Sequence, residues 1–483
     1  MHPLELTSEA LQKALDQTAR FVREEIDSLE AQPSADVAGG EELARTFVEP
    51  VPSGPRPLES ILERLRPAIR KTFNTAGPGY LAFIPGGGIM SAAIADFIAA
   101  STNRYVGVRP PAPALAQIEE TAIAWLARVM GYPETAGGIL TSGGSLSTLS
   151  AIVAAREAKL PEDFSKGTIY VSEETHYCVP KAARVAGFRD WQVKRVAVDA
   201  RRRIDPKELA RGIEMDRVKG FNPFLVIANV GTTNTGAIDD LPGVLSVARS
   251  HSMWVHADAA YGGFFRLASA GPSLMPEIEE CDSITLDPHK GMFLPYGTGC
   301  LLVRDPENLK RAHSMDAEYL HDVKAETSPN FSDLSPELSR DFRGLRIWLP
   351  LVLHGLDAFR DAIEEKLMLT RWAYERLRKD LRFEILDEPQ LSVIAFRLKG
   401  EGPDSDRLNE ELQRRVNARG RVFLSSTRLD GRYVIRLCVL SFRTHMDRVR
   451  DAVEAIFAEA DSLQAAVGRA GAIRRTFPAP PRR

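Results

Sequence analysis

The sequence has little of several features that would place it in a well-defined class. Its 483 residues include four cysteines, Cys178, Cys281, Cys300 and Cys438, which lie far apart and match no metal-ligand spacing. The nine histidines form no H-E-x-x-H or similar pair, so a metal enzyme is not expected. Free thiols of this kind are typical of a reducing compartment.

Long apolar runs and an excess of one charge are also missing. No apolar stretch reaches membrane-spanning length, and the first residues lack the basic and apolar parts of a signal peptide. The formal net charge is -3 with 26% charged residues, which gives no reason to expect nucleic acid or an anionic membrane as a partner. Together these absences predict a soluble cytoplasmic enzyme.

The chain is long enough for one large and one smaller domain. Short runs rich in Val, Ile and Leu alternate with helix-length segments through its middle, which predicts an α/β domain with a mainly parallel sheet covered on both faces. Three later strand-like runs, at 383–386, 392–396 and 433–437, predict a small α+β domain. The expected divisions are a helical N-terminal arm at 1–82, a large domain at 83–367, a small C-terminal domain at 368–470 and a disordered tail at 471–483.

The pair Asp258 and Lys290 is the most informative feature of the chain. Each residue closes or follows a short apolar run, 255–258 and 283–286, that reads as a buried strand. Such strands present chemistry at their carboxyl ends. An amine that can form a Schiff base and a carboxylate that keeps a pyridine nitrogen protonated are what pyridoxal 5'-phosphate (PLP) requires of a protein. The alternative is a structural aspartate and a surface lysine on unrelated strands.

With these motifs in this order, residues 57–457 resemble the PLP-dependent group II amino-acid decarboxylases, close to the aromatic L-amino-acid decarboxylases. The resemblance implies PLP-dependent transferase fold type I, with a mainly parallel seven-stranded sheet in the large domain. It also implies a homodimer with shared active sites, and decarboxylation of an L-amino acid, aromatic by preference, to the amine and carbon dioxide.

A glycine-bearing turn, Gly143-Gly144-Ser145, opens a helix rich in Ala and Leu. Backbone N–H groups and the helix dipole favour an anion at such a place, although many turns of this kind only connect elements. The resemblance assigns the PLP phosphate to these three residues. It implies further cofactor contacts from His176, which would stack on the ring and deliver a proton, and from Thr233, Asp258, Ala260, Asp287, His289 and Lys290. Asp239 matches a supporting acid of the family, or only caps a helix.

The segments around Tyr80–Gly86 and Tyr105–Val108 match those that shape the substrate pocket in the family. The resemblance therefore implies pocket roles for Phe83, Ile84, Pro85 and Val108, with core packing as the alternative. Arg109 would select an acidic substrate or simply reach solvent. Arg436 matches a family arginine that binds either the substrate carboxylate or a domain interface.

Phe331 departs from the family pattern. It falls in the pocket where the decarboxylases carry a loop tyrosine that protonates the carbanion, and phenylalanine has no proton to give. In similar enzymes this replacement accompanies oxygen-consuming aldehyde synthesis, which is one alternative; an acidic amino-acid decarboxylase is another. Tyr177, His176 or Tyr319 could replace the missing donor. A non-catalytic phosphate-ligand binding protein is the alternative from a different class, and the presence of both Asp258 and Lys290 argues against it.

Overall fold

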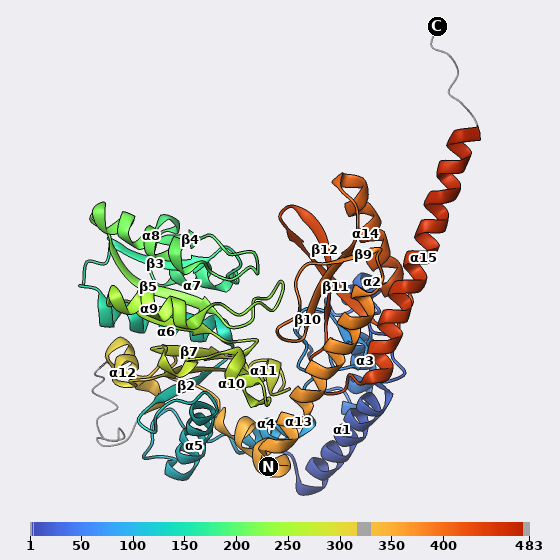
Figure 1. Ribbon diagram of the computed structural model, residues 1–483. Helices are drawn as coiled ribbons and strands as arrows, with labels where there is room; N and C mark the ends of the chain where they lie inside the picture. Colours follow the sequence, from blue (N-terminus) through green and yellow to red (C-terminus); the bar gives the residue numbers. More distant parts are fainter. Residues whose placement is uncertain (1, 3, 316–329, 477–483) are drawn as a thin grey trace.

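The computed structural model describes residues 2, 4–315 and 330–476. It contains two sheets: one of seven strands in the middle of the chain, and one of five strands built mainly from the C-terminal part. In Figure 1 the two sheets lie on opposite sides of the molecule, with helix α13 (Gly344–Arg378) running between them. The expected fold type, an α/β domain with a seven-stranded and mainly parallel sheet, is confirmed.

The seven-stranded sheet has the order β2-β8-β7-β6-β5-β3-β4. Strands β3 to β7 pair in parallel, while β8 runs antiparallel to both of its neighbours. All residues of β3, β6, β7 and β8 are buried, as continuous apolar strands in a sheet covered on both faces should be. The bounds are β2 (Gly137–Thr141), β3 (Gly167–Ser172), β4 (Val193–Val196), β5 (Asn222–Asn229), β6 (Trp254–Asp258), β7 (Ser283–Leu286) and β8 (Gly299–Val303).

Helices cover both faces of this sheet. Helix α6 (Gly144–Lys159) packs across β5 to β8 with α7 (Cys178–Val185) and α12 (Glu307–His313) beside it. The crossover helices α8 (Pro206–Val218) and α9 (Leu241–Ser250) pack against each other and on β5, on the opposite face. The connections between strands are therefore helical. The remaining helices of this part are α4 (Met90–Thr102), α5 (Pro113–Val129), α10 (Gly271–Leu274) and α11 (Pro288–Gly291).

The second sheet has the order β1-β11-β12-β10-β9. The three runs expected at this end of the chain form β9 (Phe383–Ile385), β10 (Val393–Leu398) and β12 (Arg432–Cys438). Two further strands join them: β11 (Phe423–Leu429) and the two-residue β1 (Tyr80–Leu81), which pairs parallel to β11 from the other end of the chain. Helices α14 (Gly402–Ala418) and α15 (Met446–Thr476) pack on this sheet or beside it.

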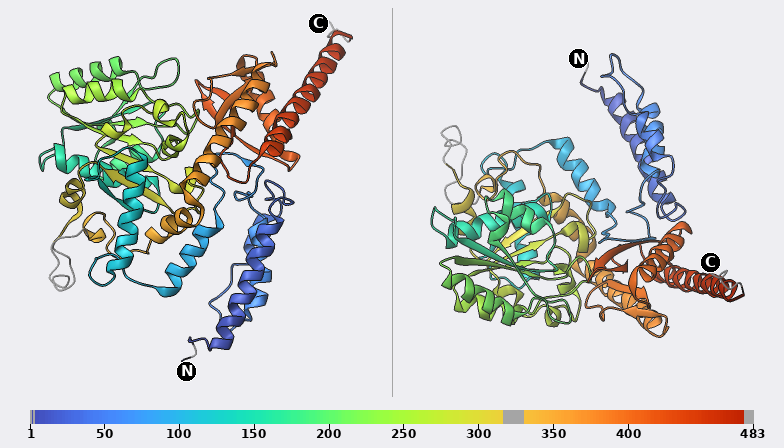
Figure 2. Two further views of the ribbon diagram at one scale, coloured as in Figure 1. Left: turned by 60° about the horizontal axis from the view of Figure 1, so that its bottom comes forward. Right: turned by 90° about the horizontal axis from the view of Figure 1, so that it is seen from above.

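The two ends of the chain extend away from the body of the molecule. Helices α1 (Ser8–Ser28), α2 (Gly40–Arg45) and α3 (Leu58–Arg70) form an arm that projects outward in both views of Figure 2. Helix α15 reaches Thr476, six residues into the segment expected to be a disordered tail. The exact division into arm, two domains and tail stays a prediction.

Among the described residues, no helix combines the length and the apolar character that crossing a membrane requires. All four cysteines are buried and unpaired.

Candidate active site

Three neighbouring strands bring polar groups to one edge of the large sheet. Asn229 ends β5 and Asp258 ends β6, and the two residues are partners in the register of these strands. Strand β7 pairs in parallel with β6, so Asp287 and Lys290, which follow β7, emerge at the same edge. Because parallel strands deliver their carboxyl ends together, residues far apart in sequence meet here.

A pocket of about 440 Å³ opens at this edge. It brings together all ten residues that the resemblance assigned to the cofactor. Nine further residues line it to which the resemblance assigned no role, and the only indication of them in the sequence is that several directly follow a strand. The pocket is lined by Ser142, Gly143, Gly144, Ser145, Leu146, His176, Cys178, Asn229, Gly231, Thr232, Thr233, Asp258, Ala260, Tyr261, Asp287, His289, Lys290, Tyr296 and Gly297.

The amine of Lys290 is held by a neighbouring carboxylate. Its Nζ lies 3.0 Å from Oδ2 of Asp287. Burial acts to lower the pKa of Lys290, but the carboxylates of Asp287 and Asp258 outweigh it and the pKa is raised. The second oxygen of Asp287, Oδ1, is buried and has no hydrogen-bond partner among the described residues. A buried carboxylate oxygen without a donor is costly, so this side of the pocket is prepared to accept a further polar group.

Asp258 is buried beside Lys290, which is a cation, and His176, which can become one. Burial raises the pKa of its carboxyl group, whereas Lys290, the Ala260 N–H group and His176 act to lower it. The Ala260 N–H group donates to Oδ1 over 3.3 Å. A cationic ring nitrogen next to this carboxylate would favour its ionised form in the same way.

His176 is neutral near physiological pH, because burial lowers its pKa and Lys290 adds to that effect, although Asp258 opposes it. The backbone N–H group of Cys178 donates to Nδ1 of His176 over 3.3 Å. Nδ1 is therefore an acceptor, and the imidazole carries its single proton on Nε2.

The turn at Gly143–Ser145 forms an open helix N-terminus. No side chain caps α6, so the first amide groups of this helix are left for a ligand. A Cβ atom on Gly144 would lie 3.0 Å from Oδ2 of Asp287 and 3.4 Å from Cβ of Ala260, so only glycine leaves this space open. On the other side, Nδ1 of His289 donates to the Thr298 carbonyl over 2.6 Å, which fixes the orientation of the imidazole ring.

Asp239 is buried behind the pocket rather than in its lining. It accepts hydrogen bonds from the backbone N–H groups of Ile204, at 2.7 Å, and Asn229, at 2.6 Å. It also accepts one from the Asn229 side chain at 2.9 Å. Burial raises its pKa to about 6. Asp239 thus fixes the end of β5, including Asn229 in the pocket wall.

The residues assigned to the substrate side do not line this pocket. Phe83 is 54% exposed and has a positive φ of 54°, while Pro85 and Val108 are buried and Ile84 is half-buried. Phe331 is 1% exposed, with the Arg340 guanidinium 5.1 Å above its ring. Their part in a substrate pocket stays a prediction. Tyr319, a possible substitute proton donor, lies outside the described residues.

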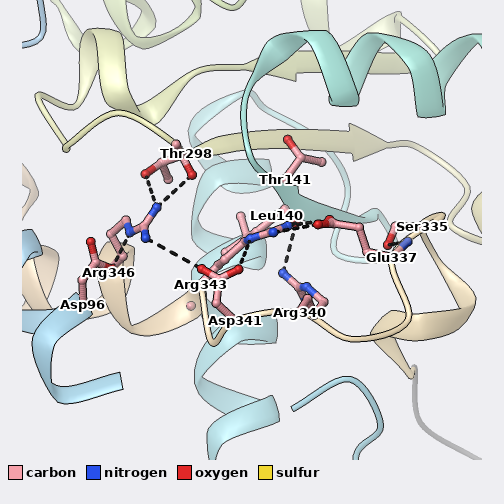
Figure 3. A network of polar contacts seen from close by, with 12 residues as sticks. Asp96, Leu140, Thr141, Thr298, Ser335, Glu337, Arg340, Asp341, Arg343 and Arg346 are labelled. Atoms are coloured by element: carbon pink, nitrogen blue, oxygen red, sulfur yellow. Dashed lines mark hydrogen bonds and ion pairs between the residues drawn. The ribbon is translucent and has the colours of Figure 1, made fainter. Parts of the chain in front are cut away.

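A polar network ties the segment after Phe331 to the pocket (Figure 3). Arg340 and Arg343 both donate to the carbonyl of Leu140, at 3.0 and 3.1 Å. Arg346 donates to the Gly297 carbonyl at 2.8 Å and to Oγ1 of Thr298 at 3.0 Å. Since Gly297 lines the pocket and Thr298 holds His289, this network connects residues 340–346 with the pocket wall.

The structure also places the two arginines whose roles were open. Arg109 forms an ion pair with Glu120 and donates to the Gln117 side chain over 2.8 Å, so its charge is already balanced. Arg436 is buried and donates to the carbonyls of Thr233, Asn234 and Phe83 and to the Ser425 hydroxyl. Arg436 therefore joins the second sheet to the loop that carries Thr233.

The pocket fits PLP in three separate respects. Lys290 supplies an amine for the aldehyde, Asp258 a carboxylate for the ring nitrogen, and the uncapped end of α6 a place for the phosphate. The orphaned oxygen of Asp287 and the space above Gly144 show that the cavity is built for an additional group.

Comparisons with known proteins agree with this fit. Residues 41–399 match the pyridoxal-dependent decarboxylase conserved domain. An aromatic-L-amino-acid decarboxylase of Bacillus atrophaeus is 34% identical over 467 residues, covering 95% of this chain and 97% of the relative. An aromatic-L-amino-acid decarboxylase of Catharanthus roseus is 28% identical, covering 93% of this chain and 94% of the relative.

Solved structures show the same fold along nearly the whole chain. The Oryza sativa TDC with PLP and tryptamine superimposes with a TM-score of 0.91 at 26% identity, covering 96% of this chain and 99% of the other. The Catharanthus roseus tryptophan decarboxylase in complex with L-tryptophan gives 0.89 at 27% identity, covering 96% and 100%. This chain therefore belongs to the pyridoxal-dependent decarboxylase family and is a PLP-dependent carboxy-lyase that acts on an amino acid.

Proposed function

We propose that the enzyme decarboxylates an aromatic L-amino acid to the corresponding amine and carbon dioxide. The observation that carries this proposal is the single pocket in which Lys290, Asp258 and His176 meet beside an uncapped helix N-terminus. The preference for an aromatic side chain is supported by the names of the relatives, which are aromatic-L-amino-acid, tryptophan and tyrosine decarboxylases.

In this proposal each pocket residue has a definite task. Bound PLP supplies an electron sink for the pair of electrons left behind when carbon dioxide departs. Lys290 would hold the cofactor covalently, and Asp258 would keep the ring nitrogen charged. His176 would lie against the ring, while Gly143, Gly144, Ser145 and His289 would hold the phosphate.

The remaining cofactor contacts support these groups. Asp287 accepts from the amine of Lys290 and orients it. Ala260 has a small side chain that leaves room for the flat ring, and Thr233 is fixed through its carbonyl by Arg436.

We also propose a homodimer in the cytoplasm. Helices α1 and α3 contain no buried residue, and their apolar side chains, with those of α4, form exposed surface that a second copy would cover. The exposed apolar residues of these helices are Leu11, Leu15, Ile61, Leu65, Ile69, Ile94, Phe97 and Ile98. A mass of one chain in sedimentation equilibrium would contradict the dimer.

The cytoplasmic location is supported by the four unpaired buried cysteines, which are typical of a reducing compartment.

A second candidate is the oxygen-consuming aldehyde synthase, which the missing hydroxyl of Phe331 favours. Against it, the ring of Phe331 is buried in the core beneath Arg340 and does not line the pocket. Selection of an acidic substrate by Arg109 loses its support, since Glu120 already pairs with this cation.

The test combines cofactor attachment with a substrate screen. Borohydride reduction of the purified protein should fix PLP to the peptide that contains Lys290, and Lys290→Ala should abolish both the fixed mass and the release of carbon dioxide. Tryptophan, tyrosine, phenylalanine, glutamate and aspartate are then compared, with amine, aldehyde, ammonia and peroxide assayed. Fixed PLP together with carbon dioxide from an acidic amino acid alone would refute the aromatic preference, and equal amounts of aldehyde, ammonia and peroxide would favour the synthase.

A further inference from the structure

Decarboxylation to an amine requires a proton donor that has not yet been identified in this pocket. When the bond to the carboxyl group breaks, carbon dioxide leaves and its bonding electrons remain at the α-carbon, which must then take up a proton. Phe331 has no acidic proton, and its ring lies outside the pocket lining. The inference that follows rests on the proposed amine-forming function.

Two phenols line the pocket among the described residues, Tyr261 and Tyr296. Tyr261 is 2% exposed, and its hydroxyl shares a 2.8 Å hydrogen bond with Oγ of Ser392 while it accepts from the Ser392 N–H group at 3.0 Å. The hydroxyl of Tyr261 is therefore engaged by Ser392, directly before β10. Tyr261 holds the pocket wall and has no freedom to approach a ligand.

Two further protic groups of the pocket, Cys178 and His176, are weaker candidates. Burial raises the pKa of the Cys178 thiol to about 12, and this side chain is itself buried. His176 is kept neutral by burial, and the N–H group of a neutral imidazole is a far weaker acid than a phenol.

Tyr296 combines access with the right surroundings. It lies in the loop between α11 and β8, and it lines the same pocket as Lys290 and His289. Its ring centroid is 5.8 Å from that of His289, and 64% of the residue is exposed. Burial of part of the ring raises the pKa of Tyr296, although Thr75 and Lys290 act to lower it, so the phenol is protonated at neutral pH.

We propose that Tyr296 is the residue that donates the proton to the α-carbon after carbon dioxide has left. The O–H bond of the phenol breaks, the carbon–hydrogen bond forms with the electron pair left at the α-carbon, and the phenolate regains a proton from water. No oxidant is needed. A donor at this place directs the reaction to the amine without a tyrosine at position 331.

The test compares Tyr296→Phe with the wild type in single turnovers on the best aromatic substrate. Removal of the hydroxyl should slow amine formation about 100-fold, the lower end of what a general acid contributes. The competing aldehyde, with ammonia and peroxide, should become the larger product in air. Tyr374→Phe is the matched control, because this phenol lies on α13 and outside the pocket lining, and it should behave as the wild type.

A second measurement does not depend on turnover. Tetranitromethane should nitrate Tyr296 in the PLP-free protein, and PLP with tryptamine should reduce nitration of this residue at least fivefold, with Tyr374 unaffected, as read from peptide masses. Amine formation by Tyr296→Phe within twofold of the wild type, or nitration that ligands leave unchanged, would overturn the assignment. If the wild type releases no carbon dioxide from any aromatic amino acid, the proposed function itself is wrong, and the nitration result still reports whether Tyr296 faces the ligand.

Discussion

At the scale of single residues, the pocket combines the amine of Lys290 with the carboxyl groups of Asp287 and Asp258. Asp287 and Asp258 raise the pKa of the Lys290 amine, while burial and that same amine act in opposite directions on the carboxyl of Asp258. Asp258 and Lys290 stand out in the sequence because each follows a short apolar run. The sequence pattern did not single out the contact of Asp287 with Lys290, which lie three positions apart, and the turn of helix α11 places the two side chains 3.0 Å from each other.

Replacement of Asp258 tests the electrostatic part of the proposal. Asp258→Asn keeps the size and removes the charge, so the ring nitrogen loses the group that holds its proton. We expect kcat to fall about 100-fold or more, in line with the loss of one preorganised charge. Asp282→Asn is the matched control, since this half-buried carboxylate precedes β7 at the opposite end of the strand and accepts from the Val255 N–H group. Equal kcat values for the two variants would contradict the role of Asp258.

At the scale of elements, the first residue of α6, Gly144, has no side chain and so leaves a space open in front of the helix. The Gly-Gly-Ser turn was recognisable in the sequence, but a turn of this kind often only connects elements. The structure distinguishes the two cases, because α6 has no side-chain cap and Gly144 faces Asp287 and Ala260, which follow β7 and β6.

Filling this space with a side chain should weaken the binding of the cofactor and leave the fold intact. Gly144→Ala places a methyl group 3.0 Å from Asp287, so we expect the Kd for PLP to rise about tenfold or more, which corresponds to about 1.4 kcal/mol. Fluorescence titration of the PLP-free protein measures this Kd. Gly212→Ala is the matched control, since its new methyl group in α8 would be 3.6 Å from Tyr170, an ordinary contact. An unchanged Kd in Gly144→Ala would show that the phosphate binds elsewhere.

The second sheet shows which elements sequence patterns miss. Strands β9, β10 and β12 coincide with the three apolar runs that predicted them. Strand β11 carries Ser425, Ser426 and Thr427 at its centre and is only partly buried, so its pattern is weak. Strand β1 has two residues, and only its pairing with β11 makes it a strand.

At the scale of the whole molecule, stability should depend on pH through the core of the large sheet. His256 on β6 is fully buried between the hydroxyls of Ser283, at 2.8 Å, and Thr285, at 3.1 Å. Burial lowers its pKa from the ordinary 6.5 to about 3. Below about pH 6.5 His256 is therefore protonated in the unfolded chain but stays neutral in the folded chain. The free energy of unfolding falls as the pH is lowered, until about pH 3.

The comparison of wild type with His256→Asn isolates this effect. We expect the free energy of unfolding in urea to lose about 1.4 kcal/mol per pH unit from this residue between pH 6 and 4. The asparagine variant should lack that part of the slope. Asp239, whose pKa burial raises to about 6, acts with the opposite sign in both proteins and cancels in the comparison. Equal slopes would show that His256 titrates normally.

The sequence by itself determined the chemistry and the type of sheet, because buried parallel strands require continuous apolar runs and PLP requires a lysine and an acid at strand ends. Only the tertiary structure decided what surrounds them. Contacts between segments up to hundreds of residues apart determine where Arg436 and Tyr296 lie. Such contacts also determine that Arg109 forms an ion pair with Glu120 and that Phe331 is buried. Such contacts follow from the packing of the whole chain and leave no local pattern in the residues that make them.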